Sequence, residues 1–334
     1  MYFLIGISLL FACLYAINFS ASVLASAVWR MLATSASRWQ ALTRSNLIFI
    51  LRSLPLATAI VFIFAFILPA YLLFEPASPG ESVGYKLAVI VGISAFGLAA
   101  ALCRMFASWW RTRRLIADWM NGSEPVTVSG ISFPAYRLRH AFPVIAVVGV
   151  IRPRIFVAEQ VFAELDEAEL TAAIAHEAGH ISSRDNFKRI AMRICGDLLV
   201  LPLWKTLDRM WLESAESAAD EYAADRGGRA FALNLASALV KIGRITPEKE
   251  VWDMPMAAYL IDPDDASLAT RVEGLLQIAD QAKPGGDSSN CLSTALWLIP
   301  ALALAVVAIL PLAANNNLLF TIHSMSESLL AALQ

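Results

Sequence analysis

The sequence predicts an α-helical membrane protein with four transmembrane helices and a cytoplasmic α+β domain inserted between the third and the fourth. Three observations lead to this fold class. The 334 residues are 58% hydrophobic and have a mean hydropathy of +0.60, which is too apolar for a typical soluble protein of this length. Four uncharged apolar stretches alternate with polar ones. Arginines gather beside particular stretches and so indicate an orientation in the membrane.

The four apolar stretches qualify as membrane spans, although the third is rather short. They cover residues 2–28, 54–73, 87–103 and 291–314. The first exceeds the apolar core of a signal peptide, so we expect it to remain as an anchor. The expected organisation is therefore a three-span region at 1–108 with a cytoplasmic loop at 29–53, a globular domain at 109–290, the fourth span at 291–314, and a short external tail at 315–334.

The arginines define the expected topology. The stretch after the first span contains Arg30, Arg38, Arg44 and Arg52 without an acidic residue, and Arg104, Arg111, Arg113 and Arg114 follow the third span. Residues 74–82 carry Glu75 and Glu81 and no base. The positive-inside rule then places the N-terminus outside, residues 74–82 outside and the globular domain in the cytoplasm. The net charge of -2 gives no bias toward nucleic acid, so we expect the lipid membrane and no direct nucleic-acid partner.

The globular domain is expected to begin with a small sheet. Residues 124–133, 142–150 and 154–162 are rich in β-branched side chains, with Gly149 and Pro153 at a bend between the last two. A helix should follow, because Asp166 is a suitable N-cap and Glu169 stands three residues later. Strand 145–148 could be an edge that pairs with an extended substrate or an interior strand, and the sequence leaves both open.

The expected helix carries "HEAGH", which contains two of the four histidines of the chain, His176 and His180, with Glu177 beside the first. Residues four apart share one helix face, so both imidazoles can bind one cation while Glu177 reaches a water on it. A zinc ion there would lower the pKa of that water and polarise a carbonyl group. An ordinary helix bearing two histidines by chance is the weaker interpretation, because such a motif seldom follows a sheet on a capped helix.

A catalytic zinc ion needs a third protein ligand. Residues 211–228 offer two overlapping pairs of acids at helical spacing, Glu216 with Asp220 and Glu221 with Asp225. In each pair, one carboxylate could bind the metal and the other could accept the outward N–H of a ligating histidine. Spacing alone separates the pairs only weakly, and a solvated acidic helix face remains the alternative. The four cysteines are scattered and predict neither disulfides nor a thiolate site.

The chain resembles the BlaR/MecR-type integral-membrane zinc metallopeptidases, which are gluzincins. The resemblance rests on "VVGVIRPRIFVAEQVF", "LDEAELTAAIAHEAGHISSRDN", "PLWKTLDRMW" and "ESAADEYAAD", in this order after three spans and before a fourth. It implies a zincin-like peptidase domain with a Zn²⁺ cofactor bound by His176, His180 and Glu216. It also implies that Asp220 holds a ligating histidine and that Glu177 is the general base.

The resemblance further implies a place and a role in the cell. The protein would lie in the bacterial cytoplasmic (inner) membrane and cut a cytoplasmic protein, such as a transcriptional repressor, during signal transduction by regulated proteolysis. The antibiotic-sensing members carry an external penicillin-binding domain, whereas only about 20 residues without Lys follow the fourth span here. Neither this tail nor residues 74–82 can fold a ligand-binding core, which needs roughly 40 residues or more.

Two other functions remain open at this point. An HtpX/Ste-type membrane peptidase for quality control or processing shares the two motifs. A membrane scaffold or receptor with a structural zinc ion is disfavoured, because Glu177 would have no purpose there. Self-association is also left open.

Two further features of the domain concern the oxyanion and the stretch that follows the motif. His140, Tyr222 and Arg226 are candidates for stabilising the oxyanion, and none is assigned. The apolar stretch 187–211 contains charged residues, among them Lys188, Arg189, Arg193, Asp197 and Lys205, and also Pro202, so we expect a buried or membrane-surface helix instead of a fifth span.

Overall fold

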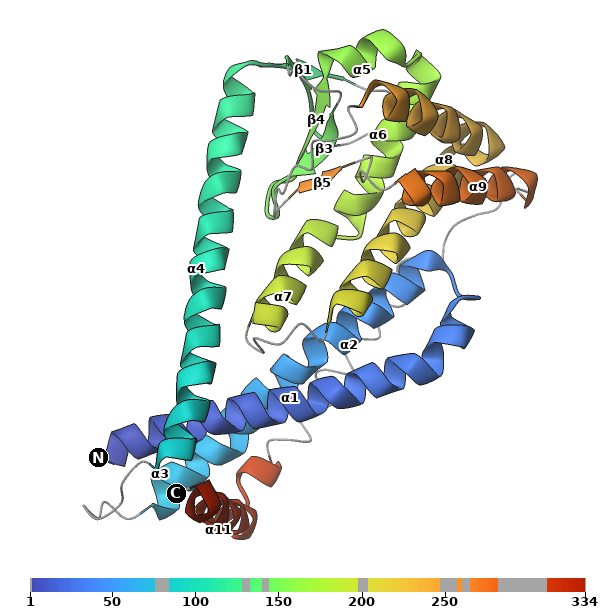
Figure 1. Ribbon diagram of the computed structural model, residues 1–334. Coiled ribbons are helices and arrows are strands. Elements are labelled where there is room, and N and C mark those ends of the chain that lie inside the picture. The colour runs from blue at the N-terminus through green and yellow to red at the C-terminus, as the bar shows by residue number, and fades with distance from the viewer. Residues whose placement is uncertain are drawn as a thin grey trace.

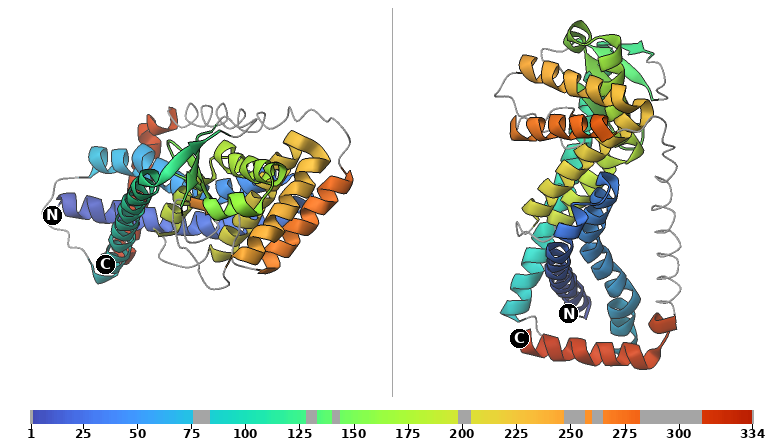
Figure 2. Two further views of the ribbon diagram at one scale, coloured as in Figure 1. Left: turned by 90° about the horizontal axis from the view of Figure 1, so that it is seen from above. Right: turned by 90° about the vertical axis from the view of Figure 1, so that its right-hand side faces the viewer.

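The computed structural model describes residues 2–75, 84–127, 133–139, 144–197, 204–246, 257–259, 265–281 and 311–333. The described chain is mostly helical, with three long apolar helical segments near the N-terminus and a second region of helices around a small sheet (Figure 1). The molecule is elongated. The sheet lies at one end and the C-terminal helix lies across the other (Figure 2).

The apolar segments are α1 (Tyr2–Ala36), the continuous run α2 (Ala41–Phe62), η1 (Ile63–Ile67) and α3 (Leu68–Phe74), and α4 (Tyr85–Asn121). Each contains a window long and apolar enough to cross a membrane, at Ile5–Ala36, Ala41–Phe74 and Ala88–Asn121. This supports the first three expected spans. Most of the expected fourth span, residues 291–310, lies outside the described part of the chain.

These helices are longer than the sequence predicts. Residues 29–53, expected as a cytoplasmic loop, are helical except at 37–40, which join α1 to α2. The third segment likewise continues through its arginines as far as Asn121. An apolar window finds the uncharged part of a helix, whereas a helix continues for as long as packing supports it. Trp29 and Ile48, which belong to the expected loop, are buried in a core shared with Trp211.

The sheet has five strands among the described residues: β1 (Ser123–Val126), β2 (Ala135–Leu138), β3 (Ile145–Val148), β4 (Arg154–Ala158) and β5 (Ala257–Tyr259). Their order is β1-β2-β4-β3-β5; only β2 and β4 pair in parallel. The hairpin between β3 and β4 turns at Gly149, whose φ of 103° suits glycine. Because β3 lies between β4 and β5, it is an interior strand and the edge alternative is wrong.

Two details of the sheet differ from the sequence prediction. The stretch expected as a strand at 154–162 leaves the sheet after Ala158 and continues as α5 (Glu159–Glu164). Strand β2 is missing from the prediction because its four residues show no clear alternation of apolar and polar side chains. Of the expected strand at 124–133, residues 128–132 lie outside the described chain.

Helix α6 (Glu167–Ser182) begins with the expected capping box. The Asp166 carboxylate accepts from the Glu169 amide at 2.8 Å, and the Glu169 carboxylate accepts from the Asp166 amide at 3.0 Å. Glu169 also accepts from Ser237 and Lys241, each at 2.7 Å. The cap therefore also joins the start of α6 to α8.

The stretch expected as one helix at 187–211 forms parts of two. Helix α7 (Asp185–Asp197) ends before it, and α8 (Lys205–Ile245) begins after residues 198–203, which include Pro202 and lie outside the described chain. Helix α8 changes direction at Gly228, which has a φ of 62°. Two further helices are α9 (Asp265–Gln281) and α11 (Asn316–Leu333), and the latter occupies most of the expected external tail.

Two buried clusters of apolar side chains hold this arrangement together. The larger lies between the sheet, α6, α8 and α9 and includes Ile155, Ile174, Leu239 and Leu275. The second joins α1 and α2 to α7 and α8. The helices that follow the sheet are thus packed directly on the apolar helices that precede it.

We expect Glu169→Gln to lower the free energy of unfolding by about 1 kcal/mol at neutral pH. The glutamine side chain has one acceptor oxygen fewer than the glutamate and lacks its negative charge beside Lys241. Burial raises the pKa of Glu169, but its hydrogen bonds with Lys241, Ser237 and the Asp166 amide outweigh burial and hold the pKa below its ordinary value of 4.5. A lowered pKa stabilises the fold above pH 4.5, and this contribution is lost as the pH falls through the folded-state pKa.

Thermal unfolding of the purified protein measures this effect. The difference between the unfolding midpoint temperatures of the wild type and the variant should decrease below pH 4.5. Glu167→Gln, at an exposed position on the same helical turn, is the control and should change little. An equal loss in both variants would contradict the specific role of Glu169.

Candidate metal centre

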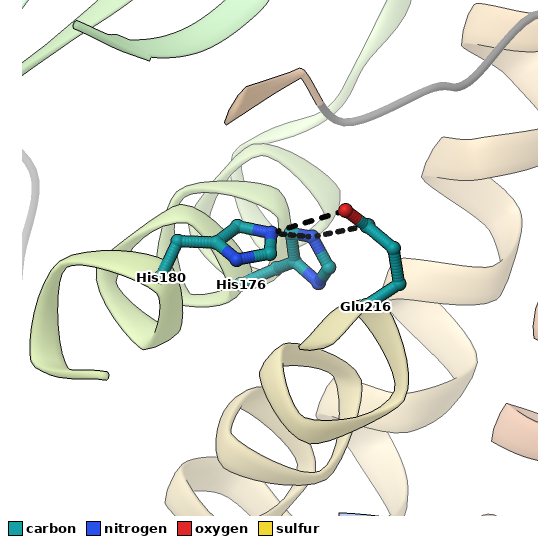
Figure 3. Close-up of side chains that lie close together, drawn as sticks. All are labelled: His176, His180 and Glu216. Atoms are coloured by element: carbon teal, nitrogen blue, oxygen red, sulfur yellow. Dashed lines mark hydrogen bonds and ion pairs between the residues drawn. The ribbon is translucent and has the colours of Figure 1, made fainter. Parts of the chain in front are cut away.

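Helix α6 brings the two histidines of the motif together. His176 and His180 are 0% and 2% exposed, and their Nε2 atoms lie 3.2 Å apart (Figure 3). Two atoms that bind one zinc ion at about 2.1 Å in tetrahedral geometry lie about 3.4 Å apart. The separation of the two nitrogens therefore suits one shared ion, as the spacing of four residues predicts.

Glu216 reaches the histidine pair from α8. Its carboxylate oxygens lie 3.5 Å from Nε2 of His176 and 3.6 Å from Nε2 of His180 (Figure 3). The ligand atoms of the three residues all lie within 4.8 Å of one another. The helices can come this close because Gly179 has no side chain: a Cβ atom there would lie 3.1 Å from Cα of Ala219 on α8. The structure thus brings together the three residues that the resemblance implies as ligands.

Asp220 lies one turn beyond Glu216 and holds the other nitrogen of His176. Nδ1 of His176 lies 2.8 Å from the Asp220 carboxylate, which can only accept, so this nitrogen donates. The hydrogen bond leaves Nε2 free of a proton and able to bind a metal.

Arg271 on α9 is a buried member of the site that the sequence analysis does not identify. Its guanidinium donates to both oxygens of Asp220, at 2.7 and 3.0 Å, and lies 3.2 Å from Glu216. The sequence offers no signal for it, because it lies far from both motifs on a helix without any metal-binding pattern. Its two-pronged contact fixes Asp220 and so fixes the ring of His176.

Asp185 accepts a hydrogen bond from Nδ1 of His180, as Asp220 does from Nδ1 of His176. Nδ1 of His180 donates to the Asp185 carboxylate at 2.8 Å, and Lys188 lies 3.4 Å from the same carboxylate. The chain returns toward His180 through Arg184, whose φ of 55° is left-handed. Asp185 lies in "HISSRDN", and an acid at this place just after the helix is a sequence signal for a partner of His180.

Glu177 is the one carboxylate of the site without a partner. It is 0% exposed, and neither of its oxygens accepts a hydrogen bond from the described part of the chain. Burial raises the pKa of Glu177 to about 7, against the opposing effect of the imidazoles of His180 and His176. A buried carboxylate of this kind is suited to exchanging a proton with a water molecule at the site.

The charges of the site favour a cation. Burial lowers the pKa of His180, but the carboxylates of Glu216 and Asp185 outweigh burial and raise it to about 10. Burial also raises the pKa of Glu216, but His180 and Arg271 hold it well below its ordinary value. Two imidazole nitrogens and one carboxylate match the three protein ligands of many catalytic zinc ions, with one position left for water. These residues therefore fit a zinc ion.

The other candidates lie elsewhere. The carboxylate of Glu221 accepts from the backbone amide of Ala41 at the start of α2, at 3.2 and 3.3 Å, and Asp225 is exposed. The hydroxyl of Tyr222 accepts from Arg226 at 2.6 Å. His140 lies outside the described residues. None of these contacts identifies an oxyanion stabiliser.

The family model described as peptidase family M48 matches residues 145–251 of the chain. The matched segment contains β3, both histidines of the motif, Glu177, Glu216 and Asp220. No curated protein matches the chain. The match supports a metallopeptidase, in agreement with the geometry of the site. It does not confirm the BlaR/MecR-type resemblance, which stays a prediction.

We expect Glu216→Ala to weaken zinc binding by more than about 100-fold. Mutation of a residue that only orients a ligand already lowers metal affinity by about 10- to 100-fold, and Glu216 is itself a ligand. Glu221→Ala is the matched control: it removes a carboxylate one turn further along the same helix, where the partner is Ala41. Metal content and competition with a chelator measure the difference. If Glu221→Ala caused the greater loss, the third ligand would have to be reassigned.

Proposed function

We propose that this protein is a membrane-embedded zinc metallopeptidase that hydrolyses peptide bonds in a cytoplasmic protein. One observation carries the proposal: two histidines and a glutamate converge at ligand distance beside a buried carboxylate that has no partner. The match to peptidase family M48 over the same segment supports it. The assignment follows the gluzincin pattern, with His176, His180 and Glu216 as ligands.

A zinc ion held by these three residues would supply Lewis acidity toward the scissile carbonyl and make a water molecule acidic enough to attack near neutral pH. Glu177 acts as the general base: its carboxylate accepts a proton from the attacking water. It then delivers this proton to the nitrogen of the leaving amine. The burial that raises the pKa of Glu177 to about 7 suits both halves of the exchange.

Asp220, Asp185 and Arg271 prepare the site for this chemistry. The two aspartates accept the Nδ1 protons of His176 and His180 and so direct both Nε2 atoms toward the same point. Arg271 prevents Asp220 from turning away. Because all these contacts exist among the described residues, little reorganisation is needed when a metal ion binds.

The three apolar helices support a protein that lies in the membrane. The proposed orientation has the N-terminus outside and the peptidase region in the cytoplasm, as the arginines indicate. The division into a three-span region at 1–108, a peptidase domain at 109–290, a fourth helix at 291–314 and a tail at 315–334 is part of the same proposal. The substrate is then a protein that approaches from the cytoplasm.

The finer proposal is regulated proteolysis of a cytoplasmic protein, such as a transcriptional repressor, in signal transduction at a bacterial inner membrane. It rests on the order of spans and on the segment "GVIRPRIFVAE". A quality-control or processing peptidase of the HtpX/Ste type is the second candidate. One observation favours keeping it: the match to peptidase family M48 supports a metallopeptidase without confirming the signalling type.

We expect Glu177→Gln to abolish peptide hydrolysis while the protein keeps its zinc, because Glu177 is the base and lies outside the ligand set. The amide preserves the size of the side chain and cannot accept the proton. Hydrolysis of casein by the purified full chain and the zinc content of the same preparations give the two measurements. Loss of zinc together with activity would contradict the assignment of Glu177.

The same variant can distinguish the two candidate functions, because an inactive peptidase retains its substrate. In cells that produce Glu177→Gln, the signalling function predicts one soluble cytoplasmic protein held by the variant and cleaved by the wild type. The quality-control function predicts many membrane proteins, increasing under stress. Quantitative mass spectrometry of both purified forms decides between the two patterns.

A further inference from the structure

We propose that Glu75, His323 and Glu327 form a second metal site, which binds a divalent transition metal such as zinc. The three residues are brought together where α11 packs against the end of α3. This place lies at the end of the molecule away from the sheet, so the site is separate from the histidine pair on α6 (Figures 1 and 2). The end of α3 and α11 are distant in sequence, and no sequence motif indicates the site.

The distances suit ligands of one ion. The ligand atoms of the three residues all lie within 4.8 Å of one another. Nε2 of His323 lies 3.8 Å from the Glu75 carboxylate. This is too long for a hydrogen bond and close to the roughly 3.4 Å that separates two ligands of a tetrahedral zinc ion. The pair thus has the spacing of two groups that share an ion.

The burial of His323 is the second observation. The residue is only 9% exposed, and its other ring nitrogen, Nδ1, is buried without a hydrogen-bond partner in the described chain. A buried imidazole nitrogen with no hydrogen bond is costly. Phe74 lies beside the ring, with 6.1 Å between the ring centroids, and keeps it in this place. A metal ion bound to the imidazole would satisfy one of the two nitrogens.

The two carboxylates beside His323 also favour a bound cation. Helix α11 carries no Lys or Arg, and Glu327 is its only acidic residue. This acid is nevertheless placed beside a second carboxylate, Glu75, at the end of α3. A cation bound by both carboxylates would reduce their mutual repulsion.

The ligand class follows from the donor atoms. One imidazole nitrogen and two carboxylate oxygens suit zinc and related divalent ions, whereas calcium and magnesium prefer oxygen ligands alone. Residues 74–82 are expected outside the membrane, so this site would draw its ion from outside while the first site faces the cytoplasm. A bound ion would clamp α11 to α3.

The experiment counts zinc ions in the full chain. The protein is purified in lipid nanodiscs without a polyhistidine tag, in a variant that carries His176→Ala and His180→Ala to remove the first site. Zn²⁺ alone is the probe, measured by titration and by metal content. We expect one equivalent of zinc to remain in this variant. Adding His323→Gln or Glu327→Gln should remove that equivalent.

Ser324→Ala is the matched control, because Ser324 is exposed on the same helix beside His323, and it should retain the zinc. Helix content and monodispersity show whether each variant is folded, and the half-buried Glu327→Gln decides if His323→Gln misfolds. The proposal is overturned if the double-histidine variant binds no zinc, as expected if His323 only packs beside Glu75. It is equally overturned if zinc binding survives both substitutions. Neither outcome depends on peptidase activity.

Discussion

The close contact of α6 with α8 at Gly179 is the constraint on which the metal centre depends. Helix α6 supplies two imidazoles and helix α8 supplies the carboxylate, so the site exists only while the two helices nearly touch. A Cβ atom at Gly179 would already lie 3.1 Å from the backbone of Ala219 and 3.2 Å from Tyr222. The capping box of α6 secures the same contact at the other end, since Glu169 is bound by Ser237 and Lys241 of α8. The helix pair is therefore fixed at two places on α6, with His176 between them.

Around this contact the protein buries several charged groups, which is costly unless each is paired. Asp220 is paired with Arg271 and His176, and Asp185 with His180 and Lys188. Glu177 is buried without such a partner. An unpaired buried carboxylate lowers the stability of the fold. This cost is the physical reason for assigning Glu177 a chemical role.

The parts that could be predicted from the sequence are those that depend on neighbouring residues. The start of α6 at Asp166, the shared face of His176 and His180, and the turn at Gly149 all follow from local spacing. Arg271 and the Glu75, His323 and Glu327 cluster depend on contacts between distant segments, which no local pattern reports. The helices continue into 29–53 for a related reason: Trp29 and Ile48 pack in one cluster with Trp211, and hydropathy does not measure packing.

Helix α8 also connects the metal centre to the membrane region. Glu216 and Asp220 face α6 and α9, whereas Glu221 accepts from the first amide of α2 and Asp208 forms an ion pair with Arg52 of α2 at 2.8 Å. Arg52 is buried but the Asp208 side chain is 46% exposed, so solvent screens this pair in part. Because these contacts share one rigid helix, a shift of α2 along α8 must either break them or move Glu216 relative to the two imidazoles. Glu216 lies 3.5 and 3.6 Å from those nitrogens, so a displacement of about 1 Å would be enough to spoil the ligand set. The position of the apolar helices and the geometry of the metal centre are therefore mechanically linked.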